Sequence, residues 1–435
     1  MPNHRISRRN FLVNSVKGAA AAAAVAVVPR HVLGGQAGPS PSDMLTHAII
    51  GVGGMGSGHI GYCQHDKTAR LLAVCDVDAQ HLDRAVKRAG AACKGYRDFR
   101  QVLDRGDIDV VHIATPPHWH AVMTIAAAEA GCDIWCEKPM TRTIGECRPV
   151  VEAVHRHGRM FRINTWFRLH GGFYGLGTAV KPLKQIVEAG LLGWPLTVRV
   201  SRFTGFNWKA KMWMGRPDLQ PQPVPAHFDY DAWLGPAPVK PYHPHRTHGS
   251  FRGYWDYDGG GLADMGQHYL DPVQYFLGKD DTSPVTVEAH APWPPHPDAA
   301  RMWGHVTLGY QDGCRIILDS TEWGDPVTKD KPYIEGPKGK VYAGFRTDPP
   351  GLRDALATLP EPKPMIADFM ESVRTRRKFG LNETNAFRSN ILVHLANTAI
   401  RTGRKLRFDP AALRFVGDDA ANRLADQPMR APWRL

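Results

Sequence analysis

The stretch IIGVGGMGSGHI, residues 49–60, decides how the first part of the chain folds. A short apolar run leads directly into a G-x-G-x-x-G pattern, and a segment with helical spacing follows. The first glycine of such a pattern allows a tight turn, the second lets a phosphate approach the backbone, and the third permits close packing of helix on strand. The free N–H groups at the helix start can bind a pyrophosphate. The pattern therefore predicts a dinucleotide site built from Gly51, Gly53, Gly54, Met55 and Gly56.

An acidic residue stands at the distance that such a site requires. Asp76 ends the next apolar run, twenty residues after Gly56. Its carboxylate is placed to accept hydrogen bonds from both ribose hydroxyls, and it would repel a 2′-phosphate. We therefore predict NAD as the cofactor and disfavour NADP. A glycine-rich turn in another α/β fold is the alternative, but it leaves the acid at this spacing without a purpose.

The chain around these motifs alternates apolar runs with helical segments. The segment at 119–131 has helical spacing, and Gly131 can end it. Alternation of this kind predicts a parallel sheet with helices on both faces. We therefore assign residues 44–165 to an α/β Rossmann domain. Its expected strands lie at 47–52, 71–76, 109–114, 133–137 and 160–164.

The rhythm changes after Arg168. Successive apolar runs now follow one another without a helix between each pair, which predicts an antiparallel sheet. We assign residues 166–435 to an α+β domain with an open, mainly antiparallel sheet. Its expected strands lie at 195–203, 284–290, 303–310 and 314–320, and its expected helices at 364–378 and 383–401.

A long proline-rich stretch runs from Phe206 to Gly249 and holds eight prolines. Loops of this length in a folded domain are usually functional or form an interface arm. The stretch is a candidate cover for a bound cofactor.

The first 37 residues have the features of an export signal. SRRNFL at 7–12 precedes an alanine–valine stretch at 18–28, and the segment holds five basic residues and no acid. A twin-arginine signal has this form, so we predict export through the twin-arginine machinery to the periplasm, already folded. An uncleaved membrane anchor is the alternative.

Composition limits the classes of binding partner and indicates the state of the cysteines. The net charge is 54 − 42 = +12, but no basic run is interleaved with aromatic residues, so nucleic-acid binding is not supported. The seven cysteines are odd in number and form no C-x-x-C pair. They fit buried reduced thiols better than a disulfide framework, as expected if the protein folds in the cytoplasm before export.

Two patterns point to catalysis. In CEKPM, Glu137 and Lys138 end an apolar run, where ligands of open α/β sheets bind. In DGGGLADMGQHYLD, Asp264 and His268 are four residues apart and share one helical face. The carboxylate could orient an imidazole that exchanges a proton with a hydroxyl. Each pattern also has an ordinary interpretation, namely a solvated lysine and a capped helix with a surface histidine.

The glycine-rich turn, the EKP motif and the GGG-x-x-D-x-x-x-H helix together resemble the glucose–fructose oxidoreductase / inositol dehydrogenase (Gfo/Idh/MocA) family. The resemblance covers nearly all of the chain after the signal, and the segments 394–410 and 415–433 are similar to exported bacterial members. It implies a Rossmann domain followed by an open antiparallel sheet, and commonly a homo-oligomer. It implies a catalytic set of Lys138, Asp264 and His268, which we expect to face a cleft. It further implies cofactor contacts from Thr115, Pro116, His120, Glu137 and Lys138.

Other residues are weaker candidates. Arg168 and Trp255 are possible substrate contacts, with an ordinary ion pair and ordinary packing as the alternatives. Trp208 and Trp213 could likewise stack on a sugar ring. Histidines cluster at 243–248 but are interrupted by a proline and lack nearby carboxylates in the sequence, so we predict no metal site.

These observations predict an NAD-dependent oxidoreductase acting on a secondary alcohol of a sugar, sugar derivative or cyclitol. Because the periplasm is not expected to supply free NAD, the cofactor should stay tightly bound. A redox-neutral NAD-dependent glycosidase or lyase is the first alternative, although its family motif, GNLYPTHxLGP, differs from GGGLADMGQHYLDP here. A non-catalytic carbohydrate-binding or partner protein is the second.

Overall fold

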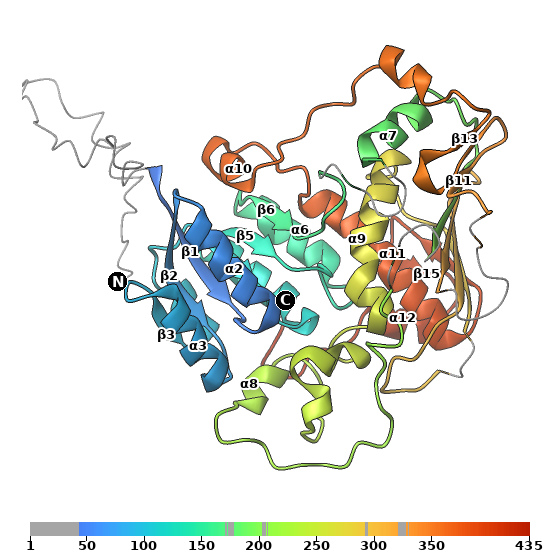
Figure 1. Ribbon diagram of the computed structural model, residues 1–435. Helices are drawn as coiled ribbons and strands as arrows, with labels where there is room; N and C mark the ends of the chain where they lie inside the picture. The colour runs from blue at the N-terminus through green and yellow to red at the C-terminus, as the bar shows by residue number, and fades with distance from the viewer. Residues whose placement is uncertain are drawn as a thin grey trace, which may run out of the picture. The chain divides into compact units, whose positions relative to one another are not determined.

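The computed structural model of the chain is drawn in Figure 1, coloured from the N-terminus to the C-terminus. The expected export segment at 1–37 lies outside the residues that it describes. Within those residues, every helix is too short or too polar to cross a bilayer. The described residues are 43–169, 172, 178–201, 206, 208–291, 295–320, 328 and 330–435.

The first sheet is parallel throughout and follows the order β3-β2-β1-β4-β5-β6. The Rossmann prediction is confirmed. Among these strands only β3 was not expected, because three residues are too few to show a pattern. The order reverses between β1 and β4, and ligands of such sheets bind at the carboxyl ends there. The strands are β1 (Leu45–Ile50), β2 (Ala69–Cys75), β3 (Lys94–Tyr96), β4 (Val110–Ile113), β5 (Asp133–Cys136) and β6 (Phe161–Ile163).

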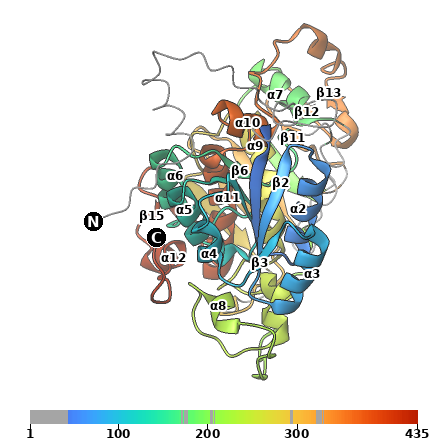
Figure 2. The same ribbon diagram turned by 90° about the vertical axis from the view of Figure 1, so that its left-hand side faces the viewer.

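Helices cover both faces of this sheet. Figure 2 shows α2 and α3 on one side of the strands and α4, α5 and α6 on the other. Helix α3 begins where the Asp78 side chain accepts hydrogen bonds from the backbone N–H groups of Gln80 and His81. The elements are α2 (Gly54–His65), α3 (Ala79–Ala89), α4 (Phe99–Leu103), η2 (Pro117–Trp119), α5 (His120–Glu129) and α6 (Cys147–Arg156).

The second sheet follows the order β13-β12-β11-β7-β10-β9-β8-β14-β15. Its pairs are antiparallel except β7 with β10, which run parallel, so the mainly antiparallel prediction is confirmed. The expected strands form its centre, and the short outer strands carried no readable pattern. The strands are β7 (Thr197–Ser201), β8 (Thr286–His290), β9 (His305–Gly309), β10 (Arg315–Asp319), β11 (Ile334–Glu335), β12 (Lys340–Val341), β13 (Thr347–Asp348), β14 (Leu406–Asp409) and β15 (Arg414–Phe415).

Two long helices, α9 (Gly260–Phe276) and α11 (Glu383–Thr402), lie between the two sheets (Figure 1). Nearly all of their side chains are buried, because each helix has a sheet domain on either side. On α11, Ile391 and Leu395 join the core of the second sheet, whereas Ala386 packs in the Rossmann core. Each such buried leucine or isoleucine contributes about 2 kcal/mol. Helix α9 is joined to the segment after β5, since Lys138 donates to Asp264 and the Met140 N–H donates to the Gln267 side chain.

Shorter elements complete the second domain. The helix expected at 364–378 is only seven residues long, and the one expected at 383–401 is α11. The seven cysteines are all buried, as predicted, and none is joined to another. The remaining elements are α7 (Val180–Glu188), α8 (Tyr230–Leu234), η4 (Pro244–Arg246), η5 (His248–Gly253), η6 (Ala343–Phe345), η7 (Asp354–Thr358), α10 (Phe369–Thr375) and α12 (Asp419–Ala425).

Candidate functional site

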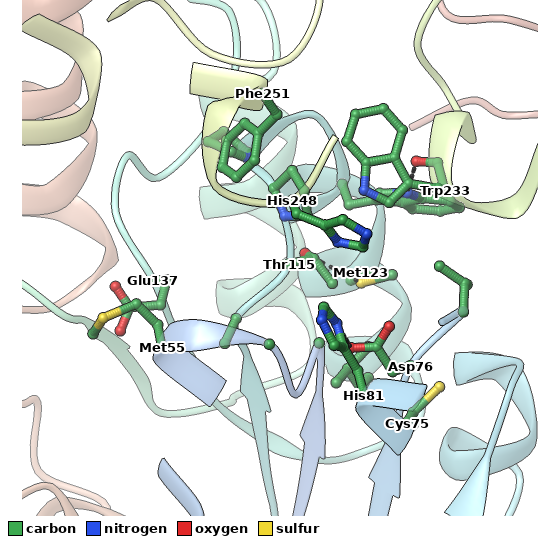
Figure 3. A pocket seen from close by; sticks show the side chains of 18 of the residues that line it. Met55, Cys75, Asp76, His81, Thr115, Met123, Glu137, Trp233, His248 and Phe251 are labelled. Carbon is green, nitrogen blue, oxygen red and sulfur yellow. Dashed lines mark hydrogen bonds and ion pairs between the residues drawn. The ribbon is translucent and has the colours of Figure 1, made fainter. Parts of the chain in front are cut away.

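A cavity of about 690 Å³ lies at the carboxyl ends of β1, β2, β4 and β5 (Figure 3). Its walls come from the Rossmann loops on one side and from the proline-rich stretch and the start of α9 on the other. The structure brings most of the residues predicted from the sequence together around this space. Those that line it are Gly51, Gly53, Gly54, Met55, Asp76, Thr115, Pro116, Glu137, Lys138 and Asp264.

The glycine-rich loop has the shape that a pyrophosphate needs. Gly51 has φ +82°, and a Cβ there would lie 2.8 Å from the Ala114 backbone. A Cβ on Gly56 would lie 1.8 Å from the Gly51 carbonyl oxygen, so Gly56 supports the turn from behind. A Cβ on Gly54, at the first turn of α2, would meet no atom within 4 Å. Open space therefore faces the helix N-terminus, and the loop fits a dinucleotide.

Asp76 is held at the end of β2 by two backbone donors. The N–H groups of Val52 and Asp78 each lie 2.9 Å from one of its carboxylate oxygens. The sequence did not indicate its neighbour His81, whose Nδ1 lies 3.7 Å from the Asp76 carboxylate. That carboxylate raises the pKa of His81. This end of the cavity therefore offers a fixed acceptor where a ribose would bind.

The proline-rich stretch closes the cavity from the opposite side. Figure 3 shows Trp233, His248 and Phe251 across the space from Asp76 and His81. Backbone hydrogen bonds attach the stretch to the β2–α3 loop, since the Ala79 N–H donates to the His227 carbonyl at 2.9 Å and the Asp229 N–H to the Val77 carbonyl at 3.1 Å. The predicted cover is thus placed over the cofactor cavity.

Three further contacts secure this cover. Nε2 of His118 and Nε1 of Trp119 lie 2.9 and 3.0 Å from the Trp233 carbonyl oxygen. The Asp78 carboxylate lies 3.4 Å from Nε2 of His248. The sequence showed histidines near residue 248 without carboxylates, whereas the fold supplies one from the β2–α3 loop.

Lys138 and Asp264 meet at the other end of the cavity. Nζ of Lys138 donates to the Asp264 carboxylate at 2.7 Å and to its backbone carbonyl at 2.6 Å. Nε of Arg252 donates to the same carboxylate at 2.7 Å, and Nζ of Lys209 lies 3.9 Å away. Burial alone would raise the pKa of Asp264, but Lys138 and Arg252 hold it well below its usual range. Asp264 is therefore ionised and fixes the position of Lys138.

His268 lies outside the cavity. Its side chain is 1% exposed and stacks on Trp166 with ring centroids 3.8 Å apart. Its Nδ1 has no hydrogen-bond partner among the described residues, and the Asp264 carboxylate bonds cations instead of this imidazole. Burial lowers the pKa of His268 well below its usual value, so the ring is neutral near pH 7. His268 is buried and is not among the described residues that line this cavity, so its part in the chemistry stays a prediction.

Glu137 joins a buried chain of histidines that the sequence did not reveal. The Glu137 carboxylate accepts from Nε2 of His59 at 2.9 Å. Nδ1 of His59 lies 2.8 Å from Nδ1 of His112, and Nε2 of His112 lies 2.9 Å from Nδ1 of His47. Asn164 donates to the same glutamate oxygen at 2.5 Å. Burial would raise the pKa of Glu137, but His59 and Lys138 bring it to about 2. Glu137 is thus an ionised acceptor beside Lys138.

Three predicted contacts lie away from the cavity. His120 is buried and bridges the carbonyls of Pro139 and Thr115 at 2.7 and 2.8 Å, which ties two cavity loops together. Arg168 is buried in ion pairs with Asp271 and Asp280. Trp255 donates from Nε1 to the carbonyl of His296 at 3.0 Å. The structure therefore agrees with the ordinary alternatives, an ion pair for Arg168 and packing for Trp255.

Of the other two tryptophans considered as sugar contacts, one lines the cavity and one is buried away from it. Trp213 lines the cavity with Arg252 over its ring, and Trp208 is buried with Nε1 donating to the Asp319 carbonyl. Trp433, two residues before the last, also lines the cavity and contacts Trp119 with ring centroids 4.6 Å apart. No sequence pattern predicted that this segment would reach the site.

Comparison with known proteins agrees with this site. Residues 45–165 match the model of the oxidoreductase family NAD-binding Rossmann fold, and residues 176–435 match that of the oxidoreductase family C-terminal alpha/beta domain. The chain belongs to the Gfo/Idh/MocA family. The first model is that of an NAD-binding domain and covers the glycine-rich loop and Asp76, in agreement with the fit of both to NAD.

Curated relatives match over part of their length. Inositol 2-dehydrogenase of Salmonella typhimurium is 31% identical over 156 residues, which covers 35% of this chain and 44% of the relative. A glycosyl hydrolase family 109 protein of Shewanella baltica is 35% identical over 175 residues, covering 35% of this chain and 38% of the relative. The chain thus spans less than half of each.

Solved structures share the fold at low identity. The WlbA dehydrogenase of Bordetella pertussis, in complex with NADH and UDP-GlcNAcA, has a TM-score of 0.57 and 19% identity, covering 84% of this chain and 99% of that one. Aldose-aldose oxidoreductase of Caulobacter crescentus has a TM-score of 0.53 and 20% identity, covering 84% and 100%. The fold of this chain therefore occurs in solved structures over most of its length.

Proposed function

We propose that this Gfo/Idh/MocA protein oxidises a secondary alcohol of a sugar, sugar derivative or cyclitol, with an NAD that stays bound between turnovers. The observation that carries the proposal is the placement of Lys138, fixed by Asp264, in the same cavity as the glycine-rich loop. Relatives and structural neighbours named for inositol, aldoses and a nucleotide sugar support the substrate class.

When bound, NAD supplies the acceptor for a hydride from the carbinol carbon. The chain's own residues would bind and orient the alcohol. The Lys138 ammonium would donate to the substrate oxygen and stabilise the negative charge that develops there. Asp264 would keep that ammonium in place. His268 would serve as the base, because its neutral imidazole, stacked on Trp166, is in the form that can accept a proton.

The cover supports the proposal that NAD is retained. The proline-rich stretch is bonded through its backbone to the β2–α3 loop, which would slow its opening and the release of a dinucleotide. The twin-arginine motif supports export to the periplasm with the cofactor already inside. Homo-oligomer formation remains a prediction.

A redox-neutral glycosidase or lyase is the second candidate, and the 35% identical glycosyl hydrolase family 109 relative favours it. Transient oxidation would acidify a neighbouring C–H bond, elimination would follow, and the hydride would return. The same Lys138 and Asp264 would serve this path.

The test is incubation of the purified protein with a panel of sugars, cyclitols and glycosides without added nucleotide, read by NMR. An oxidised product with a reduced partner supports the oxidoreductase, and a cleaved glycoside without net redox change supports the second candidate. Binding without any product would point to the non-catalytic alternative.

A further inference from the structure

Imidazoles from both sides of the cavity mouth meet at one buried carboxylate. Asp78, in the β2–α3 loop, is 2% exposed. Its Oδ1 accepts hydrogen bonds from the backbone N–H groups of Gln80 and His81 and so begins α3. Its Oδ2 faces the proline-rich stretch, 3.4 Å from Nε2 of His248 and 3.8 Å from Nε2 of His227. One oxygen is therefore engaged by the backbone, and the other faces nitrogen atoms that can bind a metal ion.

His81 adds an imidazole from the first turn of α3. One ligand atom from each of Asp78, His81 and His248 lies within 4.8 Å of the others. The ring centroids of His81 and His248 are 4.8 Å apart, and Figure 3 shows the two rings close together near Asp76. Both histidines line the cavity, so an ion can reach this group from solvent.

The spacing of these atoms suits a shared ion better than direct hydrogen bonds. An N–H···O bond is about 2.9 Å long, which is shorter than either distance from the Asp78 carboxylate. Ligand atoms of a tetrahedral zinc site, each about 2.1 Å from the ion, lie about 3.4 Å from one another. The buried pair of His59 and His112 is a contrast in the same domain, because its nitrogens are 2.8 Å apart, at hydrogen-bond distance.

The backbone holds the two contributing segments side by side. The Ala79 N–H donates to the His227 carbonyl at 2.9 Å, and Asp78 forms a β-bridge with Phe228. Backbone donors also orient the Asp78 carboxylate, as outer contacts usually do for metal-binding side chains. The fold thus brings the ligand atoms together itself, which lowers the cost of binding an ion.

The sequence predicted no metal site because the histidines near residue 248 lacked a nearby carboxylate. Asp78 supplies that carboxylate from a distant segment. Asp76, the expected ribose acceptor, is a separate group whose oxygens accept from the N–H groups of Val52 and Asp78. A metal site and a ribose site would therefore use different carboxylates.

We propose that Asp78, His81 and His248 bind a divalent transition-metal ion, with Zn²⁺ as the expected ion and His227 as the nearest fourth ligand. Imidazole nitrogens with one carboxylate form a donor set that suits zinc, whereas Mg²⁺ and Ca²⁺ prefer oxygen ligands. Asp78 and His81 belong to the Rossmann domain, and His248 belongs to the cover. The ion would therefore join the cover to the Rossmann domain at the mouth of the cavity.

The first test measures zinc binding to the purified protein. The protein is stripped with a chelator, returned to chelator-free buffer and titrated with Zn²⁺ in competition with a chromophoric chelator. The wild type should bind about one Zn²⁺ per chain, and Mg²⁺ should not compete. His248→Ala and Asp78→Asn should each weaken binding about a hundredfold or more, because loss of an outer contact alone costs a metal site roughly 10–100-fold.

The variants have matched controls. Asparagine begins a helix as well as aspartate does, so Asp78→Asn keeps the start of α3. His290→Ala removes an exposed histidine whose Nε2 lies 3.8 Å from the Glu288 carboxylate, and this variant should bind zinc as the wild type does. Equal zinc binding by His248→Ala and the wild type would show that the ion binds elsewhere and would overturn the inference.

The second test examines whether the ion joins the cover to the domain. Excess Zn²⁺ should raise the melting temperature of the wild type on the order of 5 °C, because an ion that binds only the folded state stabilises it. In protein that holds NAD, Zn²⁺ should also slow NAD release about tenfold, a common size for coupling between two sites. His248→Ala should show neither effect.

Only the effect on NAD release rests on the proposed function, so the possible failures are distinguishable. Zinc binding that depends on His248 but leaves both the melting temperature and NAD release unchanged would overturn the joining of the cover. A protein that binds zinc as predicted but retains no NAD would contradict the resident cofactor and leave the metal site standing.

Discussion

The two ends of the cavity are formed by different kinds of chemical group. The end that fits the pyrophosphate and ribose consists of glycine backbone, a helix N-terminus and one carboxylate held by backbone N–H groups. The catalytic end consists of charged side chains, with Lys138 far in sequence from Arg252 and Asp264. Backbone geometry fixes a ligand, whereas side-chain charge changes its reactivity. We therefore expect changes at the first end to alter NAD retention and changes at the second to alter rate.

Lys138→Ala should show the largest difference between the effect on rate and the effect on NAD retention. Loss of the ammonium should lower the rate of sugar oxidation by about a hundredfold or more, because it removes the cation that Asp264 holds in the cavity to stabilise the developing charge. Bound NAD, measured by chromatography after denaturation, should stay as in the wild type. Lys405→Ala, at an exposed lysine, serves as the control. Loss of NAD in Lys138→Ala would show that the two ends are not separable.

Asp76→Ser should show the opposite result, a large effect on NAD binding. Removal of a charged hydrogen-bond acceptor typically costs about 2 kcal/mol, so NAD affinity should fall roughly thirtyfold. The bias against NADP should relax, because the repelling charge is gone. Equilibrium binding of both nucleotides checks this, and an unaltered protein with equal affinity for the two would refute the role of Asp76.

His268→Ala separates packing from chemistry. The ring is 1% exposed and stacked on Trp166, so truncation leaves a cavity and should reduce the free energy of unfolding by about 2 kcal/mol. Denaturant unfolding measures this. If stability were unchanged while the rate collapsed, His268 would act in the chemistry without a packing role.

The smallest effect is expected at the cover. His248→Ala removes the side chain 3.4 Å from the Asp78 carboxylate but leaves the backbone bonds of the proline-rich stretch intact. A partly exposed pair of this kind contributes under about 1 kcal/mol, so NAD release should speed up a few-fold at most. The rate of NAD release is measured in excess competing nucleotide and chelator. A hundredfold change would show that the Asp78–His248 pair is the main contact that keeps the cover closed.

The sequence predicted the first end of the cavity better than the second. The glycine-rich turn and Asp76 lie within 26 residues, from Gly51 to Asp76, and their chemistry depends on local geometry. Lys138 was found because a strand end fixes its direction. The approach of Arg252 and Trp433 depends on packing between distant segments, which no local pattern records.

The helix at 260–276 shows the same limit. Its spacing predicted that Asp264 and His268 lie on one face, but the stacking of His268 on Trp166, a hundred residues away in sequence, could not be read from that spacing.

The most direct test of a resident cofactor is the nucleotide content of the purified protein. After extensive dialysis the protein is denatured, and released nucleotide is quantified by chromatography. We predict close to one NAD or NADH per chain, because the cover over the glycine-rich cavity must open before release. A dialysed protein that is folded, empty and only a weak binder of added NAD would contradict this account.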